Sequence, residues 1–331
     1  MGRALGRLAR RFFSYSVRIV TLLLAVSVIS FALVTVSPID PVQQYILGLG
    51  TAVSPEQRAE IEDYWGVDQP PAKRYLSWLG ELLHGNLGQS ALYRRPVADV
   101  IAERFVNSLA LMLCAWVLAG VIGFALGCVM GVCHGRWPDR LLKGLCYLLS
   151  SVPTFWLGLV LLLVFAVALG WFPVGFSSPI GVRGEDVSLW QRLYHLALPA
   201  LTLSLMSFAS IALHTRQKLI GVLSSEYVLF ARARGEGAWT ILRRHGLRSI
   251  LLPALTLQFA SFAELFGGSV LAENVFSYPG LGSAVAAAGL NSDVPLLLGI
   301  TLFSALFVCV GNLIANLLYG VVDPRIGTVE P

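Results

Sequence analysis

Long apolar runs alternate with shorter polar segments along the whole chain. A transmembrane helix needs about 20 predominantly apolar residues. Runs of about this length cover residues 19–36, 107–133, 145–169, 196–214, 250–271 and 296–319. The pattern therefore predicts an all-α integral membrane protein with six transmembrane helices.

The first apolar run follows Arg3, Arg7, Arg10 and Arg11, an order that a secretory signal peptide also shows. The apolar part of a signal peptide usually has only about 7–15 residues. No small-x-small cleavage site stands out before Pro38. We therefore expect an uncleaved transmembrane helix.

Composition and charge fit this interpretation. With 56% hydrophobic and 13% charged residues, the 331-residue chain has too little charge to cover a soluble globule. If both termini are cytoplasmic, 16 of the 24 Lys and Arg lie inside and about 13 of the 19 Asp and Glu lie outside. This asymmetry satisfies the positive-inside rule, so we expect an N-in, C-in topology. It also accounts for the net charge without binding to nucleic acid.

A polar segment over residues 40–102 lies on the outer side in this topology and predicts a small external helical insertion. Ser54, Pro55 and Glu56 are typical of a helix start, with Gly66 closing that helix, and a second helix is expected from Pro70 to Gly85. The expected organisation is then residues 1–102 as first helix plus insertion, 103–320 as five-helix core and 321–331 as a short cytoplasmic tail.

The charged segment 224–253 separates two apolar runs and is punctuated by glycine. Ser225 is suited to cap a helix, Glu226 lies in its first turn, and Arg234 precedes Gly235, an order that suits the helix dipole. We expect a short helix over residues 226–234 and a second over 238–245. Residue chemistry alone also allows a basic loop resting on anionic lipid headgroups.

Three phrases in this segment carry a resemblance to a known family. ARARG at 231–235, RHGLR at 244–248 and LLP at 251–253 resemble the EAA loop of ABC-importer permeases. The resemblance implies that the loop, residues 216–250, forms a coupling helix that sits in a groove of a separate ATPase subunit. The coupling residues that it implies are Glu226, Tyr227, Phe230, Ala231, Ala233, Arg234, Gly235 and Gly237.

Further phrases extend the resemblance over nearly the whole chain. SVPTFWLG at 151–158, ENVFSYPGLG at 273–282 and DPR at 323–325 are similar to phrases of the permeases of peptide, nickel and metallophore importers. This resemblance implies a type I ABC importer transmembrane domain in the bacterial inner membrane. It implies a homologous second permease, ATPase subunits and an external solute-binding protein as partners, besides membrane lipid. The phrase at 273–282, together with the preceding AELFGGSV at 263–270, resembles the nickel and metallophore branch somewhat more than the peptide branch.

Glycines recur at three- and four-residue spacing in the second apolar run, at Gly120, Gly123, Gly127 and Gly131. Small residues on one face let transmembrane helices approach closely. We therefore interpret Gly123, Gly127 and Gly131 as a helix-packing face, toward either the same chain or a second subunit.

Glu264 is the one acid deep within an apolar run, and such a residue is costly in a membrane. It either lines a translocation path or pairs with a neighbouring helix. Ser207 and Ser210 in the fourth run either hydrogen-bond neighbouring helices or line the same path.

Enzymatic chemistry is not expected from this chain. No G-x-x-x-x-G-K-[ST] phosphate loop is present, so ATP hydrolysis would belong to another subunit. The five cysteines lack metal-site spacing, and we expect no metal and no cofactor. An intramembrane enzyme would need a motif such as HExxH or GxSxG, and neither occurs. An ATP-independent channel or secondary carrier is the nearer alternative.

Overall fold

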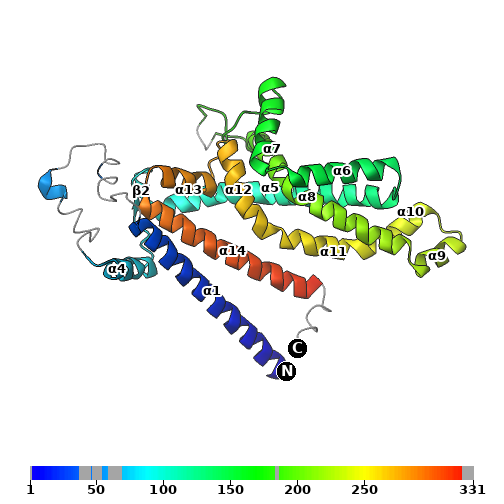
Figure 1. Ribbon diagram of the computed structural model, residues 1–331, viewed down its shortest axis with the longest axis horizontal. Coiled ribbons are helices and arrows are strands. Elements are labelled where there is room, and N and C mark those ends of the chain that lie inside the picture. The colour runs from blue at the N-terminus through cyan, green and yellow to red at the C-terminus, as the bar shows by residue number, and fades with distance from the viewer. Residues whose placement is uncertain (1, 37–45, 47–53, 59–68, 183–185, 323–331) are drawn as a thin grey trace. The chain divides into compact units, whose positions relative to one another are not determined.

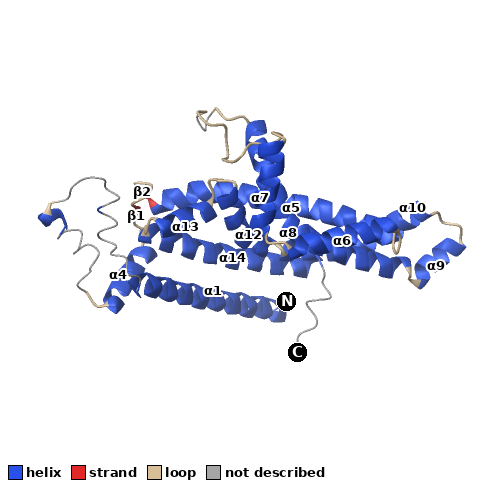
Figure 2. Cartoon of the chain, turned by 45° about the horizontal axis from the view of Figure 1, so that its top comes forward, coloured by secondary structure: helices blue, strands red, loops and turns tan. Residues whose placement is uncertain are grey.

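The computed structural model describes residues 2–36, 46, 54–58, 69–182 and 186–322, and nearly all of this part is helical (Figures 1 and 2). The helix end expected at Gly66 and the DPR phrase at 323–325 lie outside the described residues. The chain divides into two compact units. One comprises Met1–Val106 and Gly280–Leu313, and the other Asn107–Pro279 and Ile314–Pro331.

The first unit contains long helices and one short hairpin. Its elements are α1 (Gly2–Val36), α4 (Pro71–Leu83), β1 (Gln89–Ser90), β2 (Arg95–Pro96), the start of α5 (Val97–Val132), α13 (Leu281–Leu290) and most of α14 (Val294–Val322). Helix α4 agrees with the helix expected between Pro70 and Gly85. It packs on α1, where the Tyr75 hydroxyl lies 2.8 Å from the Ser27 hydroxyl and the Tyr75 and Trp78 rings contact Phe31.

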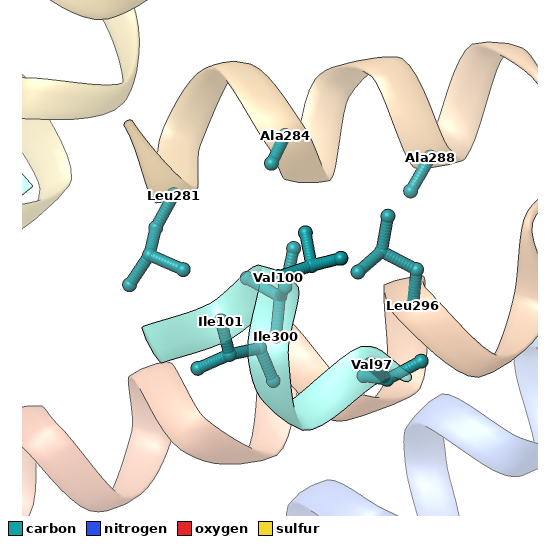
Figure 3. Close-up of a cluster of buried hydrophobic side chains, with 8 residues drawn as sticks. All are labelled: Val97, Val100, Ile101, Leu281, Ala284, Ala288, Leu296 and Ile300. Atoms are coloured by element: carbon teal, nitrogen blue, oxygen red, sulfur yellow. The ribbon is translucent and has the colours of Figure 1, made fainter. Parts of the chain in front are cut away.

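The core of the first unit lies where α5, α13 and α14 meet (Figure 3). The buried side chains are Val97, Val100, Ile101, Leu281, Ala284, Ala288, Leu296 and Ile300. Small alanines on α13 face branched residues of the other two helices, which lets three helices share one apolar core. The hairpin is fixed to this core by Asp293, whose carboxylate accepts hydrogen bonds from the Ser90 hydroxyl at 2.6 Å and the Leu92 amide at 3.0 Å.

The second unit contains the remainder of α5 and the segments around the charged loop. Its elements are α6 (Trp137–Ser151), α7 (Thr154–Leu161), the π-helix η1 (Leu162–Ala168), α8 (Leu189–Leu223), α9 (Glu226–Ala233), α10 (Ala238–Ile241), the π-helix η2 (Leu242–Gly246), α11 (Leu247–Ala260) and α12 (Phe262–Val275). Helices α6 and α11 both pack along α8. Helices α9 and α10 lie beyond the adjacent ends of α8 and α11 (Figure 1).

The glycine stripe of α5 lies against α8 within this unit. A Cβ atom at Gly123 would come within 2.7 Å of the Phe208 carbonyl oxygen, and one at Gly127 within 2.5 Å of Thr215 Cβ. At Gly131 it would come within 2.8 Å of the Leu219 side chain. The absence of side chains at these positions therefore sets the distance between α5 and α8.

Three described helices, Tyr15–Val36, Val97–Val132 and Val294–Ala315, are each long and apolar enough to cross a membrane. Three bent pairs pass the same test, so the described residues hold up to six spans, and the six-span topology stays a prediction. The span expected over 145–169, with Pro153 near its start, corresponds to one of these bent pairs. Helices α6 and α7 meet at an angle of 110° because Pro153, in extended conformation, stands between them.

Candidate functional site

Helix α9 and the turn that follows it form the candidate site. Ser225 is extended and Glu226 starts the helix, as the sequence predicts. The expected side-chain cap is wrong, however. The Ser225 hydroxyl donates to the Val222 carbonyl oxygen at 2.5 Å, so the hydroxyl belongs to the end of α8 and not to the start of α9.

The end of α9 is a complete Schellman motif. The Gly235 amide donates to the Arg232 carbonyl oxygen at 2.9 Å, and the Glu236 amide donates to the Ala231 carbonyl oxygen at 3.1 Å. Gly235 has φ +84°, in the left-handed region where a side chain is strained. The turn therefore depends on glycine at this one position.

Glu236 joins the turn to the helix that follows it. One carboxylate oxygen pairs with the Arg234 guanidinium at 2.8 Å, and the other lies 3.3 Å from His245 Nε2 in η2. The Tyr227 ring of α9 also contacts the His245 ring, with centroids 6.1 Å apart. These contacts brace α9 against η2. The second helix begins at Ala238, as expected, but its expected end at His245 is wrong, because α10, η2 and α11 follow one another without a break. Gly246 stays helical and lies close to Leu219 and Leu242.

The loop has a small apolar core of its own. Val228 and Ala231 of α9 and Ile241 of α10 are buried, and Val222 and Leu223 pack against them. Ala231 thus holds the loop together, whereas the other residues that the resemblance implies for coupling are surface groups. Those described as exposed are Glu226, Tyr227, Phe230, Ala233, Arg234, Gly235 and Gly237.

Large apolar side chains project from this loop. Phe230 is 75% exposed, Trp239 71%, Leu229 54% and Tyr227 49%. The sequence did not predict Trp239 as a site residue, because only the three-dimensional fold shows that its side chain lies outside the loop core. We call Tyr227, Leu229, Phe230 and Trp239 the α9 knob. Aromatic residues rigidly presented beside arginines are typical of protein-binding surfaces.

The three candidate path residues differ in exposure. Glu264 is exposed in the first turn of α12, just after the bend at Ser261. Ser207 is buried in α8 and Ser210 is exposed. Within the described part of the chain, none of the three hydrogen-bonds to another of them.

Buried acids elsewhere in the second unit were missed by the sequence interpretation. Asp139, at the start of α6, accepts from Arg216 of α8 at 2.5 Å and from the Gly135 amide at 2.9 Å. Glu273 of α12 is fully buried and accepts from the Ser108 hydroxyl of α5 at 2.6 Å. Both acids join helices distant in sequence. Among the described residues, no group of three or more His, Cys, Asp or Glu side chains is placed to hold a metal ion.

The comparison with known families covers nearly the whole chain. Residues 123–328 match the family described as "Binding-protein-dependent transport system inner membrane component". Residues 6–112 match its N-terminal companion, "Binding-prot-dependent transport system membrane comp, N-term".

Individual relatives agree with the family match. The chain is 33% identical to the oligopeptide transport system permease protein AppB of Bacillus subtilis (strain 168), over 93% of this chain and 96% of that protein. It is 36% identical to the glutathione transport system permease protein GsiC of Escherichia coli O6:H1, over 92% and 94% of the two chains. An inward-facing structure of the MetNI methionine ABC transporter has a similar fold, with a TM-score of 0.53 at 16% identity, over 68% of this chain and 97% of that chain. The chain therefore belongs to the family of inner membrane components of binding-protein-dependent transport systems, and it is a multi-pass permease with the fold of an ABC importer transmembrane domain.

Proposed function

We propose that this chain forms half of the membrane pathway of an ATP-driven peptide importer, and that the α9 knob docks into a separate ATPase subunit. The observation that carries the proposal is the knob itself. Its aromatic side chains are held outward by the Schellman turn at Gly235 and by the Glu236 brace. A loop with a fixed shape can pass a movement of the ATPase subunit on to the membrane helices, whereas a flexible loop would deform instead.

The competing interpretation is that the basic residues of this loop bind anionic lipid headgroups and not a protein. Lipid attraction requires positive charge near headgroups, but it requires neither a fixed backbone turn nor an internal apolar core. The loop has both, through Gly235 and the buried Val228, Ala231 and Ile241. These features favour binding to a complementary groove on a protein over binding to a lipid surface.

Peptides or peptide-like molecules are the proposed solutes, because the relatives reported above are named for oligopeptide and glutathione transport. The resemblance to the nickel and metallophore branch lies in the stretches 263–270 and 273–282. In the phrase at 273–282, the Glu273, Phe276 and Tyr278 side chains are buried inside the second unit, at 0%, 1% and 4% exposure. Buried packing residues do not contact a passing solute, so this phrase is a poor guide to the substrate.

The remaining partners follow from the proposed role. A homologous permease would supply the other half of the pathway, and an external binding protein would deliver the peptide. ATP hydrolysis would take place in the ATPase subunits alone. The loop 216–250 would face the cytoplasm, and tags at Gln69 and Asp186 would be accessible from outside.

The docking role is tested by a matched pair of glycine substitutions. Gly235→Val places a β-branched residue at φ +84°, which we expect to break the turn while leaving the membrane helices intact. Gly221→Val makes the same chemical change in α8, where a Cβ meets no atom of the described residues within 4 Å and φ is not positive. Each variant is purified in detergent together with its ATPase, and peptide uptake is measured in cells.

We expect Gly235→Val to insert normally and to lose ATPase retention and uptake, with Gly221→Val close to wild type. Full ATPase retention by Gly235→Val would refute the docking role. The substrate class is tested separately, by uptake of radiolabelled di- and tripeptides and of nickel in cells that lack other importers. Nickel uptake without peptide uptake would replace the proposed substrate class and leave the docking role untouched.

A further inference from the structure

A cavity of about 290 Å³ lies between α8 and α11, near the end of α8 that leads into the α9 loop. The described residues that line it all belong to the second unit, so it does not depend on how the two units are placed. None of the individual coupling or path residues named above lines it, although Lys218 and Ile250 belong to the two ends of the loop 216–250. The cavity therefore needs an explanation of its own.

One end of the cavity is polar and cationic. His214 and Lys218 are one helical turn apart on α8, and both are exposed. Thr215 lies beside them and also lines the cavity. An ammonium group, an imidazole and a hydroxyl are together a set of hydrogen-bond donors suited to an anion.

The Thr215 hydroxyl is the most informative group at this end. Thr215 is only 2% exposed, and its Oγ1 atom has no hydrogen-bond partner among the described residues. Other helical threonines, such as Thr202 and Thr256, donate to the carbonyl four residues before them. An unpaired buried hydroxyl costs about 1–3 kcal/mol. A ligand that accepts a hydrogen bond from Thr215 would remove this cost.

The α11 side of the cavity is mostly apolar, with Ile250, Leu252, Pro253 and Leu257 among its lining residues. Thr256 also lines it, but its hydroxyl already donates to the Leu252 carbonyl oxygen. A small hydrophilic anion would cover the donors and leave these walls without a contact. An amphiphile with an anionic head and hydrocarbon tails satisfies both ends at once.

We propose that this cavity binds the phosphate headgroup of an anionic phospholipid, with the first part of its acyl chains on the α11 wall. Lys218 and His214 contact the phosphate, and Thr215 donates to one of its oxygens. Basic pockets between transmembrane helices are known to hold anionic headgroups. The site lies beside the start of the α9 loop, so its occupancy fixes the end of α8 from which that loop departs. Binding here does not depend on which solute is transported.

The test titrates purified full-length protein in a neutral detergent with dihexanoyl-phosphatidylglycerol and follows the thermal unfolding midpoint. Dihexanoyl-phosphatidylcholine is the control lipid without net negative charge, and inorganic phosphate is the control anion without acyl chains. We expect phosphatidylglycerol alone to raise the midpoint. In Lys218→Ala the half-saturating concentration should rise about tenfold, because one charge-assisted contact is lost. Lys143→Ala removes the same side chain on α6, away from the cavity, and should behave as wild type.

Thr215→Val removes the hydroxyl while keeping a side chain of nearly the same shape, so it tests the contribution of the hydroxyl alone. Without lipid, this variant should be at least as stable as wild type, because an unpaired buried hydroxyl is removed. With phosphatidylglycerol, it should show a smaller midpoint shift than wild type. Three results would overturn the proposal: an equal loss of affinity in Lys218→Ala and Lys143→Ala, a full midpoint shift produced by inorganic phosphate, or an undiminished lipid shift in Thr215→Val.

Discussion

Replacing Gly127 by alanine tests the packing that holds the second unit together. The new Cβ atom would lie 2.5 Å from Thr215 Cβ and 2.7 Å from the Ala212 carbonyl oxygen. Ordinary contacts between such atoms are about 3.5–4.0 Å. Neither neighbour can turn away, because one is a backbone atom and the other is attached directly to the backbone. Helices α5 and α8 must therefore separate locally by about 1 Å.

Gly144→Ala provides a matched control for the size of this effect. Gly144 lies within α6, and a Cβ there meets nothing within 4 Å. Alanine is favoured over glycine within a helix by about 1 kcal/mol at both positions. The difference between the two variants therefore isolates the collision, and overpacking of this kind costs about 1–3 kcal/mol. The expected gap corresponds to about a 5- to 150-fold difference in the unfolding equilibrium constant.

Reversible unfolding of the purified chain in mixed detergent micelles, followed by circular dichroism, measures this gap. We expect Gly144→Ala to unfold at higher denaturant than wild type and Gly127→Ala at lower denaturant than Gly144→Ala. If Gly127→Ala is as stable as Gly144→Ala, then the glycine stripe does not set the distance between α5 and α8, and the packing argument fails.

Three further predictions concern charged residues. Asp139→Asn should lower the free energy of unfolding by about 3–5 kcal/mol, because Arg216, whose side chain is 13% exposed, loses the carboxylate that pairs with it. Arg140→Gln, at a neighbouring exposed position, is the control and should change the unfolding midpoint little. Glu236→Ala should leave the amount of inserted protein unchanged but reduce uptake several-fold, and normal uptake would show that the brace is dispensable. Glu264→Gln should insert normally and alter peptide uptake, whereas unchanged uptake of every peptide tried would remove it from the path.

The helices were largely predictable from the sequence because apolar runs of membrane length have few alternatives. The bend at Pro153 shows the limit of this reasoning. The sequence shows a proline at this position, but it does not show whether the membrane helix continues through the proline or ends before it. In this fold the helix breaks, and α6 packs along α8 through Cys146 while α7 takes another direction.

The candidate site was predictable where the backbone demanded a particular residue. A glycine after a short helix pointed to the positive φ at Gly235. The ion pairs and buried acids could not be predicted in this way. Asp139 and Arg216 are 77 positions apart, and Ser108 and Glu273 are 165 apart. Only the packing of α6 on α8 and of α12 near α5 brings these partners together.

Uptake by proteoliposomes tests the central claim most directly. The chain is reconstituted with the partner permease and ATPase subunits proposed above, with a labelled peptide and the proposed external binding protein on one side and ATP on the other. We expect peptide accumulation that requires ATP and the binding protein and that is lost in Gly235→Val. Accumulation of equal rate without ATP would contradict the account and identify the chain as a channel or secondary carrier.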